Sequence, residues 1–435
     1  MLLFPSLSAE LHLLATFALG LTLGTVVNWA IYSLRFEPLP TSPWSSTHPR
    51  DSHERWLDRL PLIGWLRLRR KGKLLGYEFW VRPLIVELLC GGLAAGLYGW
   101  EVIEMEQIFR IDEGLPQRAT LAPVSSVGVL HARFAVHLLL AMWMVAVSFI
   151  DLDEQTIPDA LTVPGTLLAL VLATLMPMGR LPDVPLVYID VAGMTIGETP
   201  PRWMNVASPW NFPATLSGSR HILGLALGLG CVWAWCAALL PRRWYGRRGW
   251  RRGSALLWAR IVREPVSRWL LLLGAAVTVA VVAVWWRGGV RWESLLSSLM
   301  GLAIGGALVW GIRIVAGHAL TEEAMGFGDV TLLGMVGAFL GWQAAFISFA
   351  LGPFFALVFF AAMWVFRRER VIPFGPFICL GTLTTIVRWR PLWLQLYEFF
   401  SATWLVPTML MLCFAGLWGA LWVIRETRLR REQSP

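Results

Sequence analysis

Long apolar stretches recur along the chain from Leu11 to Ile424, and short polar segments separate them. A helix needs about 20 apolar residues in a row to cross the hydrocarbon core of a bilayer. The stretch from 330 to 366 is too long for one such helix, so we expect a tight hairpin at 341–343. The pattern predicts about eleven transmembrane helices, near residues 11–34, 81–99, 134–150, 158–178, 221–240, 269–286, 294–316, 330–343, 344–366, 372–386 and 402–424.

The composition places the chain in the same class. Of its 435 residues, 56% are hydrophobic and only 15% are charged, and the mean hydropathy is +0.59. A single soluble core would not bury that much apolar surface. The sequence therefore predicts an all-α polytopic membrane protein.

Clusters of arginine predict how the chain is oriented in the membrane. The net charge is +9, and the basic side chains gather in four places: the loop between the first two spans, the segment 242–263, the segment 367–370 and the C-terminal tail. Under this span count all four lie on one side, and cytoplasmic loops carry an excess of Lys and Arg. We therefore expect an external N-terminus and a cytoplasmic C-terminus. Arginines beside apolar helices are typical of topology and of anionic-lipid contacts, so no nucleic-acid partner is predicted.

Two aspartates stand at the edges of apolar spans. Asp151 follows Phe149 and Ile150, and Asp329 ends the sequence Gly-Phe-Gly-Asp. A carboxylate at a membrane boundary is costly, which makes it a functional-site candidate. Under the predicted topology both aspartates lie at the cytoplasmic face. Two carboxyls a few Å apart do not both ionise easily, so one holds a proton while the other deprotonates water. Such a pair can hydrolyse a peptide bond without a metal, a thiol or a covalent intermediate.

The residues around the two aspartates have structural interpretations. Gly326 and Gly328 lack a Cβ, so the backbone there can approach a partner closely. We interpret Asp153 as a solvated acid at the end of a helix. Asp159, directly after Pro158, fits a turn in which an acid complements the N-terminal dipole of the next helix. We favour structural roles for both of these acids.

Four segments resemble, in the same order, the motifs of the prepilin peptidases, which form the type IV leader peptidase family of GxGD intramembrane aspartyl proteases. Residues 24–32 (GTVVNWAIY) are similar to the family's GSFLNVVIYR, and residues 149–164 (FIDLDEQTIPDALTVP) are similar to IDxxxxxIPDxLTLP. Residues 326–343 begin with GFGD and end with GAFLGWQ, and residues 372–377 read IPFGPF.

The resemblance implies that Asp151 and Asp329 are the catalytic pair of an aspartyl endopeptidase that uses no cofactor for cleavage. It implies that the substrates are prepilins or pseudopilins of type IV pilus or type II secretion systems. Their leader peptide would be removed on the cytoplasmic side of the inner membrane. In bifunctional members, an N-terminal module accompanies N-methylation of the new N-terminus with S-adenosylmethionine.

The first cytoplasmic loop departs from the family pattern. Many members carry two Cys-x-x-Cys pairs there, which would suit zinc, whereas residues 35–80 contain no cysteine, so no zinc is expected. His48 and His53 alone make a poor metal site. No glycine-rich nucleotide loop supports a methyl-donor site, so methylation is implied by the resemblance alone. Glu87 is the candidate site residue of this module, and an acid that is merely paired at the interface is an equal alternative.

The sequence predicts three parts. Residues 1–99 form the N-terminal module, residues 134–386 form the GxGD peptidase core, and residues 387–435 contribute the last span and a basic tail. An insertion at about 179–293 adds two spans to the core. An even number of added spans returns the chain to the same face, so the insertion still allows the two aspartates to meet.

Two functions from other classes stay open at this stage. A proton-coupled transporter would use intramembrane acids as proton relays, although the internal repeat common in transporters is not visible. A non-catalytic membrane subunit of a pilus or type II secretion machine would keep the helices and need neither aspartate.

Overall fold

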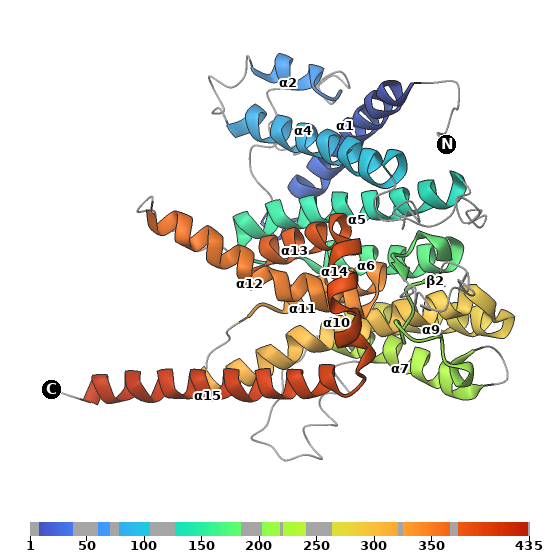
Figure 1. Ribbon diagram of the computed structural model, residues 1–435. Helices are drawn as coiled ribbons and strands as arrows, with labels where there is room; N and C mark the ends of the chain where they lie inside the picture. The colour runs from blue at the N-terminus through green and yellow to red at the C-terminus, as the bar shows by residue number, and fades with distance from the viewer. Residues whose placement is uncertain are drawn as a thin grey trace, which may run out of the picture.

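The computed structural model describes residues 8–37, 60–69, 78–104, 127–183, 202–217, 221–240, 263–320, 325–365 and 373–433 (Figure 1). These residues are almost entirely helical. The helices are α1 (Ala9–Ser33), α2 (Ile63–Leu68), α4 (Glu78–Tyr98), α5 (Val127–Glu154), α6 (Asp159–Leu175), α7 (Ile222–Leu239), α9 (Pro265–Arg287), α10 (Gly289–Leu320), α11 (Phe327–Leu340), α12 (Trp342–Val365), α13 (Gly375–Val387), α14 (Trp389–Ser401) and α15 (Leu405–Gln433). A π-helical turn, η3 (Gly99–Ile103), extends α4, and β1 (Pro182–Asp183) pairs antiparallel with β2 (Arg202–Trp203).

The helices confirm an all-α polytopic membrane protein. Within the described residues, eight helices are long and apolar enough to cross a membrane, and three more apolar helices, α6, α11 and α13, are shorter. Each of the eleven predicted spans overlaps one of these helices. The long apolar run after residue 329 is broken at Gly341, as predicted, where a φ of 95° ends α11 and α12 starts at the next residue. α14 was not predicted, because its mixed polar and aromatic sequence does not read as a span.

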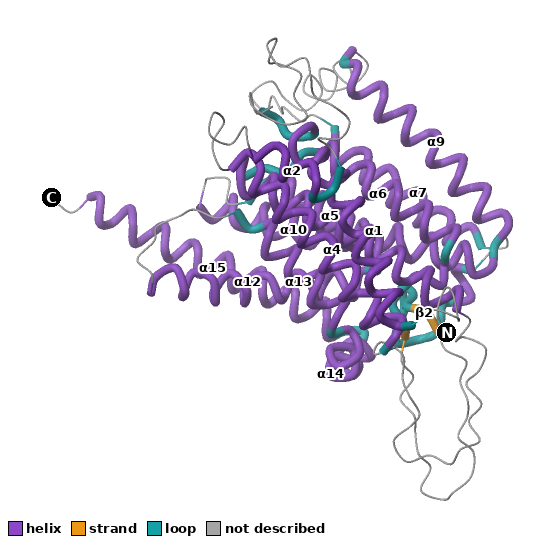
Figure 2. Tube along the Cα trace, turned by 90° about the horizontal axis from the view of Figure 1, so that it is seen from above, coloured by secondary structure: helices purple, strands orange, loops and turns teal. Residues whose placement is uncertain are grey.

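Three of the helices lie at the periphery of the bundle. α9 and the outer part of α12 bury little of their apolar surface, and α15 buries almost none. α9 lies on the opposite side of the molecule from the free end of α15 (Figure 2). Apolar faces of this size are expected to contact lipid in a membrane protein.

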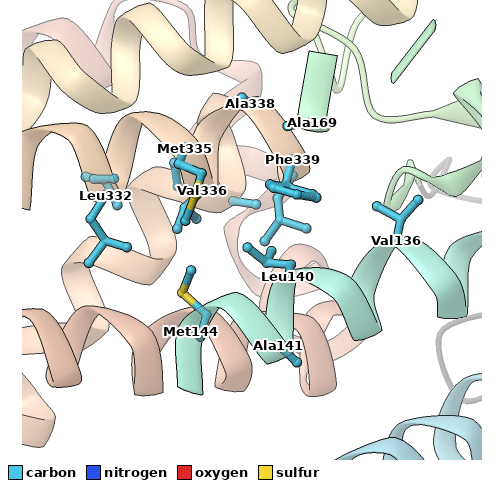
Figure 3. Packing of buried hydrophobic residues seen from close by; sticks show 14 of the residues in the cluster. Val136, Leu140, Ala141, Met144, Ala169, Leu332, Met335, Val336, Ala338 and Phe339 are labelled. Carbon is cyan, nitrogen blue, oxygen red and sulfur yellow. The ribbon is translucent and has the colours of Figure 1, made fainter. Parts of the chain in front are cut away.

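α11 lies at the centre of the bundle. Every residue from Asp329 to Leu340 is buried, so this helix is apolar on all sides instead of along one stripe. Its side chains belong to one buried hydrophobic cluster with residues of α5 and α6, and Leu140 and Met144 of α5 face α11 (Figure 3). The labelled members are Leu332, Met335, Val336, Ala338 and Phe339 of α11, Val136, Leu140, Ala141 and Met144 of α5, and Ala169 of α6. Asp329 is therefore fixed at the start of the most enclosed helix.

α10 and α11 approach each other through glycine. A side chain at Gly301 would collide with the carbonyl oxygen of Gly337, and one at Gly305 would lie 2.6 Å from the carbonyl oxygen of Leu333. Small residues are the usual way for membrane helices to bring their backbones into contact. This contact sets the depth of α11 in the bundle.

We expect Gly301→Ala to lower the free energy of unfolding by about 1–3 kcal/mol, because the added methyl group overpacks the α10–α11 contact. The measurement is thermal unfolding of the purified protein in detergent. Gly230→Ala in α7 is the matched control, since nothing lies within 4 Å of a methyl group at Gly230. Equal stability of the two variants would contradict the packing account.

The described part of the inserted segment between α6 and α7 folds onto one end of the bundle. The indole N–H groups at the starts of three helices donate 2.8 Å hydrogen bonds to its carbonyl oxygens: Trp292 to Leu216, Trp342 to Val206 and Trp389 to Pro182. Buried Arg180 donates a 3.0 Å hydrogen bond from Nη1 to the carbonyl oxygen of Ser294. Burial lowers the pKa of Arg180 to about 10, which leaves its guanidinium charged at neutral pH. The described residues of this segment are therefore packed against the bundle.

Candidate active site

The end of the bundle away from that segment brings four chain segments together. They are the last turn of α5, the loop 155–158, the start of α11 and the start of α13. Ile157 lies in the middle of this meeting. A Cβ at Gly328 would lie 2.7 Å from the Ile157 Cβ, and a Cβ at Gly375 would lie 3.1 Å from the Ile157 Cδ1. Two glycines therefore let the starts of α11 and α13 close around the loop that follows Asp151.

Asp151 lies in the last turn of α5 and is only 3% exposed. The backbone N–H of Gly375 donates a hydrogen bond to its carboxyl group. Its Oδ2 accepts no hydrogen bond from the described residues. A buried carboxylate oxygen without a partner is uncommon in folded proteins and is a natural place for a water or a substrate donor.

Asp329 lies in the first turn of α11, and Gly326 is the extended residue that precedes this helix. The position favours a carboxylate, because the backbone N–H groups at a helix start carry partial positive charge. The Thr331 hydroxyl donates a 3.0 Å hydrogen bond to the carbonyl oxygen of Gly328 and so stabilises this turn. The aspartate is 9% exposed, so it too is shielded from bulk solvent.

The two aspartates lie within electrostatic range of each other. Cys379, one turn into α13, lies within electrostatic range of both carboxyls and hydrogen-bonds to Ser148 of α5. Two candidate spans, α7 and α9, lie within the inserted segment, and the two acids lie at the same end of the bundle. Two carboxyls in this arrangement are suited to share one proton and to activate water between them.

The neighbouring acids have separate environments. Asp159 is exposed in the first turn of α6, directly after buried Pro158, which agrees with a role at the helix start. Asp153 is not simply solvated, because Arg35 and Arg82 bind its carboxyl at 3.0 and 2.8 Å.

Glu87 is fully buried in α4, in the N-terminal helix pair, and not beside the two aspartates. Its carboxyl accepts hydrogen bonds from the Thr25 hydroxyl at 3.1 Å and from the Leu62 backbone N–H at 2.9 Å. In the structure, Glu87 is therefore a buried acid with hydrogen-bond partners. Leu62 itself has a φ of 60°, a strained value for a leucine, so the turn before α2 is held in place.

No three His, Cys, Asp or Glu side chains gather closely enough to hold a metal ion within the ranges that the structure describes. His48 and His53 lie outside those ranges.

Sequence reasoning missed Arg35, Arg82 and Cys379. Each stands next to a motif, but its partner lies far away along the chain: Arg35 and Asp153 are 118 residues apart. No local signal in the sequence points to these ion pairs, and they were not predicted.

Comparisons with known proteins relate part of the chain to one protein family. Residues 259–361 match the model of the type IV leader peptidase family. The chain is similar to this family over these residues. The matched residues contain Asp329 but not Asp151, and no solved structure matches the chain.

Several curated relatives carry the family's activity in their names. The chain is similar to a prepilin leader peptidase/N-methyltransferase of Myxococcus xanthus, at 26% identity over 54% of this chain and 60% of the relative. The enzyme of the same name from Aeromonas salmonicida is 30% identical over 20% of this chain and 30% of the relative. A type 4 prepilin-like proteins leader peptide-processing enzyme of Escherichia coli is 26% identical over 34% of this chain and 56% of the relative. The chain thus matches less than two thirds of each relative's length.

Proposed function

We propose that the protein is a membrane-embedded aspartyl endopeptidase that removes the leader peptide of type IV prepilins or pseudopilins. The observation that carries this proposal is the meeting of Asp151 and Asp329, which are far apart in sequence but interact at one end of the bundle. The names of the relatives support the choice of substrate. No metal or other cofactor takes part in the proposed cleavage.

In the proposed mechanism, the ionised carboxylate of the pair takes a proton from a water molecule, and the hydroxide attacks the scissile carbonyl carbon. The protonated carboxyl donates a hydrogen bond to the carbonyl oxygen and stabilises the charge that develops there. Collapse of the tetrahedral intermediate breaks the C–N bond, and the leaving amine receives a proton from the pair. The products are a leader peptide with a free carboxylate and a mature N-terminus.

We place this reaction at the cytoplasmic face of the inner membrane. The arginine clusters support this orientation, because the loops that carry them connect helix ends at the aspartate end of the bundle. Arg35 follows α1 and Arg82 lies at the start of α4, and both pair with Asp153 at the end of α5. The same loops would contact anionic lipid headgroups.

N-methylation of the new N-terminus is a second, separate part of the proposal. It rests on the relatives' names and on the N-terminal helix pair α1 and α4, in which Glu87 is the buried acid. S-Adenosylmethionine would be the methyl donor for this step alone.

Incubation of the purified protein with pilin-like precursors from the same organism, followed by mass spectrometry of the products, tests both parts. We expect a mature N-terminus after leader removal, and a further mass increase of one methyl group only when S-adenosylmethionine is added. Uncut precursors would contradict the peptidase proposal. In that case, proton-coupled uptake into proteoliposomes would identify a transporter, and its absence would favour a non-catalytic assembly subunit.

A further inference from the structure

The last turn of α5 is held by the N-terminal helices. Arg35, just after α1, binds Asp153 through Nη2 and Glu154 through Nε, each at 3.0 Å. Arg82, in the first turns of α4, binds Asp153 through Nη2 at 2.8 Å. The two arginines come from two different helices and converge on one carboxylate. We call these four residues the arginine clamp.

Backbone contacts extend the clamp on both sides of Asp151. Arg82 Nη2 donates a 3.1 Å hydrogen bond to the carbonyl oxygen of Phe149, two residues before Asp151. The Glu154 carboxyl accepts the backbone N–H groups of Phe36 and Glu37 at 3.0 and 3.1 Å. Residues 149, 153 and 154 lie within one helical turn of Asp151, so these bonds fix the rotation and position of that turn.

The clamp is partly shielded from solvent. The Arg35 side chain is 5% exposed and the Glu154 side chain 10%, whereas Asp153 and Arg82 are 23% and 27% exposed. Pairs at this depth are screened less by water and salt than surface pairs. Removal of one partner also leaves the other charge partly buried and uncompensated.

In the part of the chain that the structure describes, no ion pair holds the loop that follows this turn. After Glu154, Gln155 adopts a φ of 55°, and the chain leaves the helix for the loop around Ile157. The Asp151 carboxyl itself receives one backbone hydrogen bond, from Gly375. Among the described residues, the arginine clamp therefore supplies the ion pairs that fix the end of α5 against α1 and α4.

We propose that Arg35 and Arg82 are positioning residues that hold Asp151 at the correct distance from Asp329. Through them, the N-terminal helix pair α1 and α4 acts directly on the peptidase site. This inference rests on the proposed function for its kinetic consequences, but its structural consequence is measurable without any substrate.

The kinetic test compares Arg35→Ala, Arg82→Ala and Arg82→Lys with the parent on a cleavable precursor. We expect each alanine variant to lower kcat by about 10- to 100-fold with KM within about twofold, because a displacement of the acid near 1 Å has effects of this size. Arg82→Lys should recover part of kcat, since lysine keeps the positive charge for Asp153 but lacks the guanidinium group whose Nη2 contacts both Asp153 and the carbonyl oxygen of Phe149. Arg69→Ala is the matched control, because Arg69 is exposed and stacks on Trp80 of α4.

A double-substitution cycle separates the clamp from a general loss of fold. If Arg82 acts through Asp153, the loss of kcat in the double variant Arg82→Ala, Asp153→Ala should be smaller than the product of the two single losses. Additive losses would show that the two side chains act independently, and would overturn the clamp.

The substrate-free test uses Cys379 as a reporter. Replacing Cys90, Cys231, Cys236 and Cys413 by alanine leaves this buried thiol, which contacts Ser148 of α5, as the single cysteine. We expect N-ethylmaleimide to label Cys379 at least about fivefold faster when Arg82 is replaced by alanine, and at the parent rate in Arg69→Ala.

The two tests distinguish failure of the inference from failure of the proposed function. If the parent cleaves no precursor but the labelling rate rises as expected, the clamp stands and the peptidase assignment falls. If cleavage is normal in the parent while kcat and labelling are unchanged in Arg35→Ala and Arg82→Ala, the clamp is wrong. Where an alanine variant does not fold, Arg82→Lys gives the deciding rates.

Discussion

Asp151→Asn and Asp329→Asn should each abolish leader cleavage, with losses of about 10³-fold or more in kcat. An amide can neither take a proton from water nor give one to the leaving amine, so either substitution removes one half of the shared acid–base pair. Each variant should still insert in the membrane, because asparagine has the same shape as aspartate and costs less to bury. The measurement is precursor processing in cells and with purified protein.

Two further variants show whether the loss of cleavage is specific to the aspartate pair: the double aspartate variant and a variant of a distant acid. Residues that act as one unit lose activity together, so Asp151→Asn, Asp329→Asn should be no slower than either single variant. Glu293→Gln is the control, since Glu293 is half-buried near the start of α10, at the other end of the bundle. Normal processing by either aspartate variant would end the assignment.

The spans could be predicted from the sequence because apolar length alone determines them. The ends of the spans could not. α5 begins at Val127, seven residues before the predicted start, because its polar residues are buried with partners from elsewhere. His137 binds Glu101 at 2.6 Å, and Arg133 lies 5.2 Å from the ring of Trp203. A span predicted from hydropathy ends at such polar residues, whereas in the folded protein they are buried with partners and the helix continues.

The position of the candidate site could be predicted further than its internal contacts. The motifs around Asp151 and Asp329, and the even number of inserted spans, were enough to expect the two acids to meet. The contacts that hold this site in place could not be predicted. Gly375 contacts Asp151 across 224 residues of sequence, and Arg82 contacts Asp153 across 71. Contacts at such separations depend on how helices pack, and a local pattern does not carry that information.

Gly375→Ala should reduce cleavage by about 100-fold while the protein remains folded. The α13 backbone meets Asp151 so closely at this point that an added methyl group would collide with the carboxylate. The collision would push the acid away from Asp329 or move the start of α13, and either shift would weaken the hydrogen bond from the Gly375 N–H. In the sequence Pro-Phe-Gly-Pro, the glycine thus matters for the reaction because its lack of a side chain leaves room for the Asp151 carboxylate.

Two comparisons separate this steric effect from an ordinary loss of stability. Gly96→Ala in α4 adds the same methyl group where nothing lies within 4 Å, so its activity and thermal unfolding should equal those of the parent. Gly375→Ala should lower kcat strongly but the unfolding temperature only slightly, because the clash involves one side chain instead of the helix core. Parent-like kcat in Gly375→Ala would mean that Asp151 tolerates displacement, and hence that its observed position is not the reactive one.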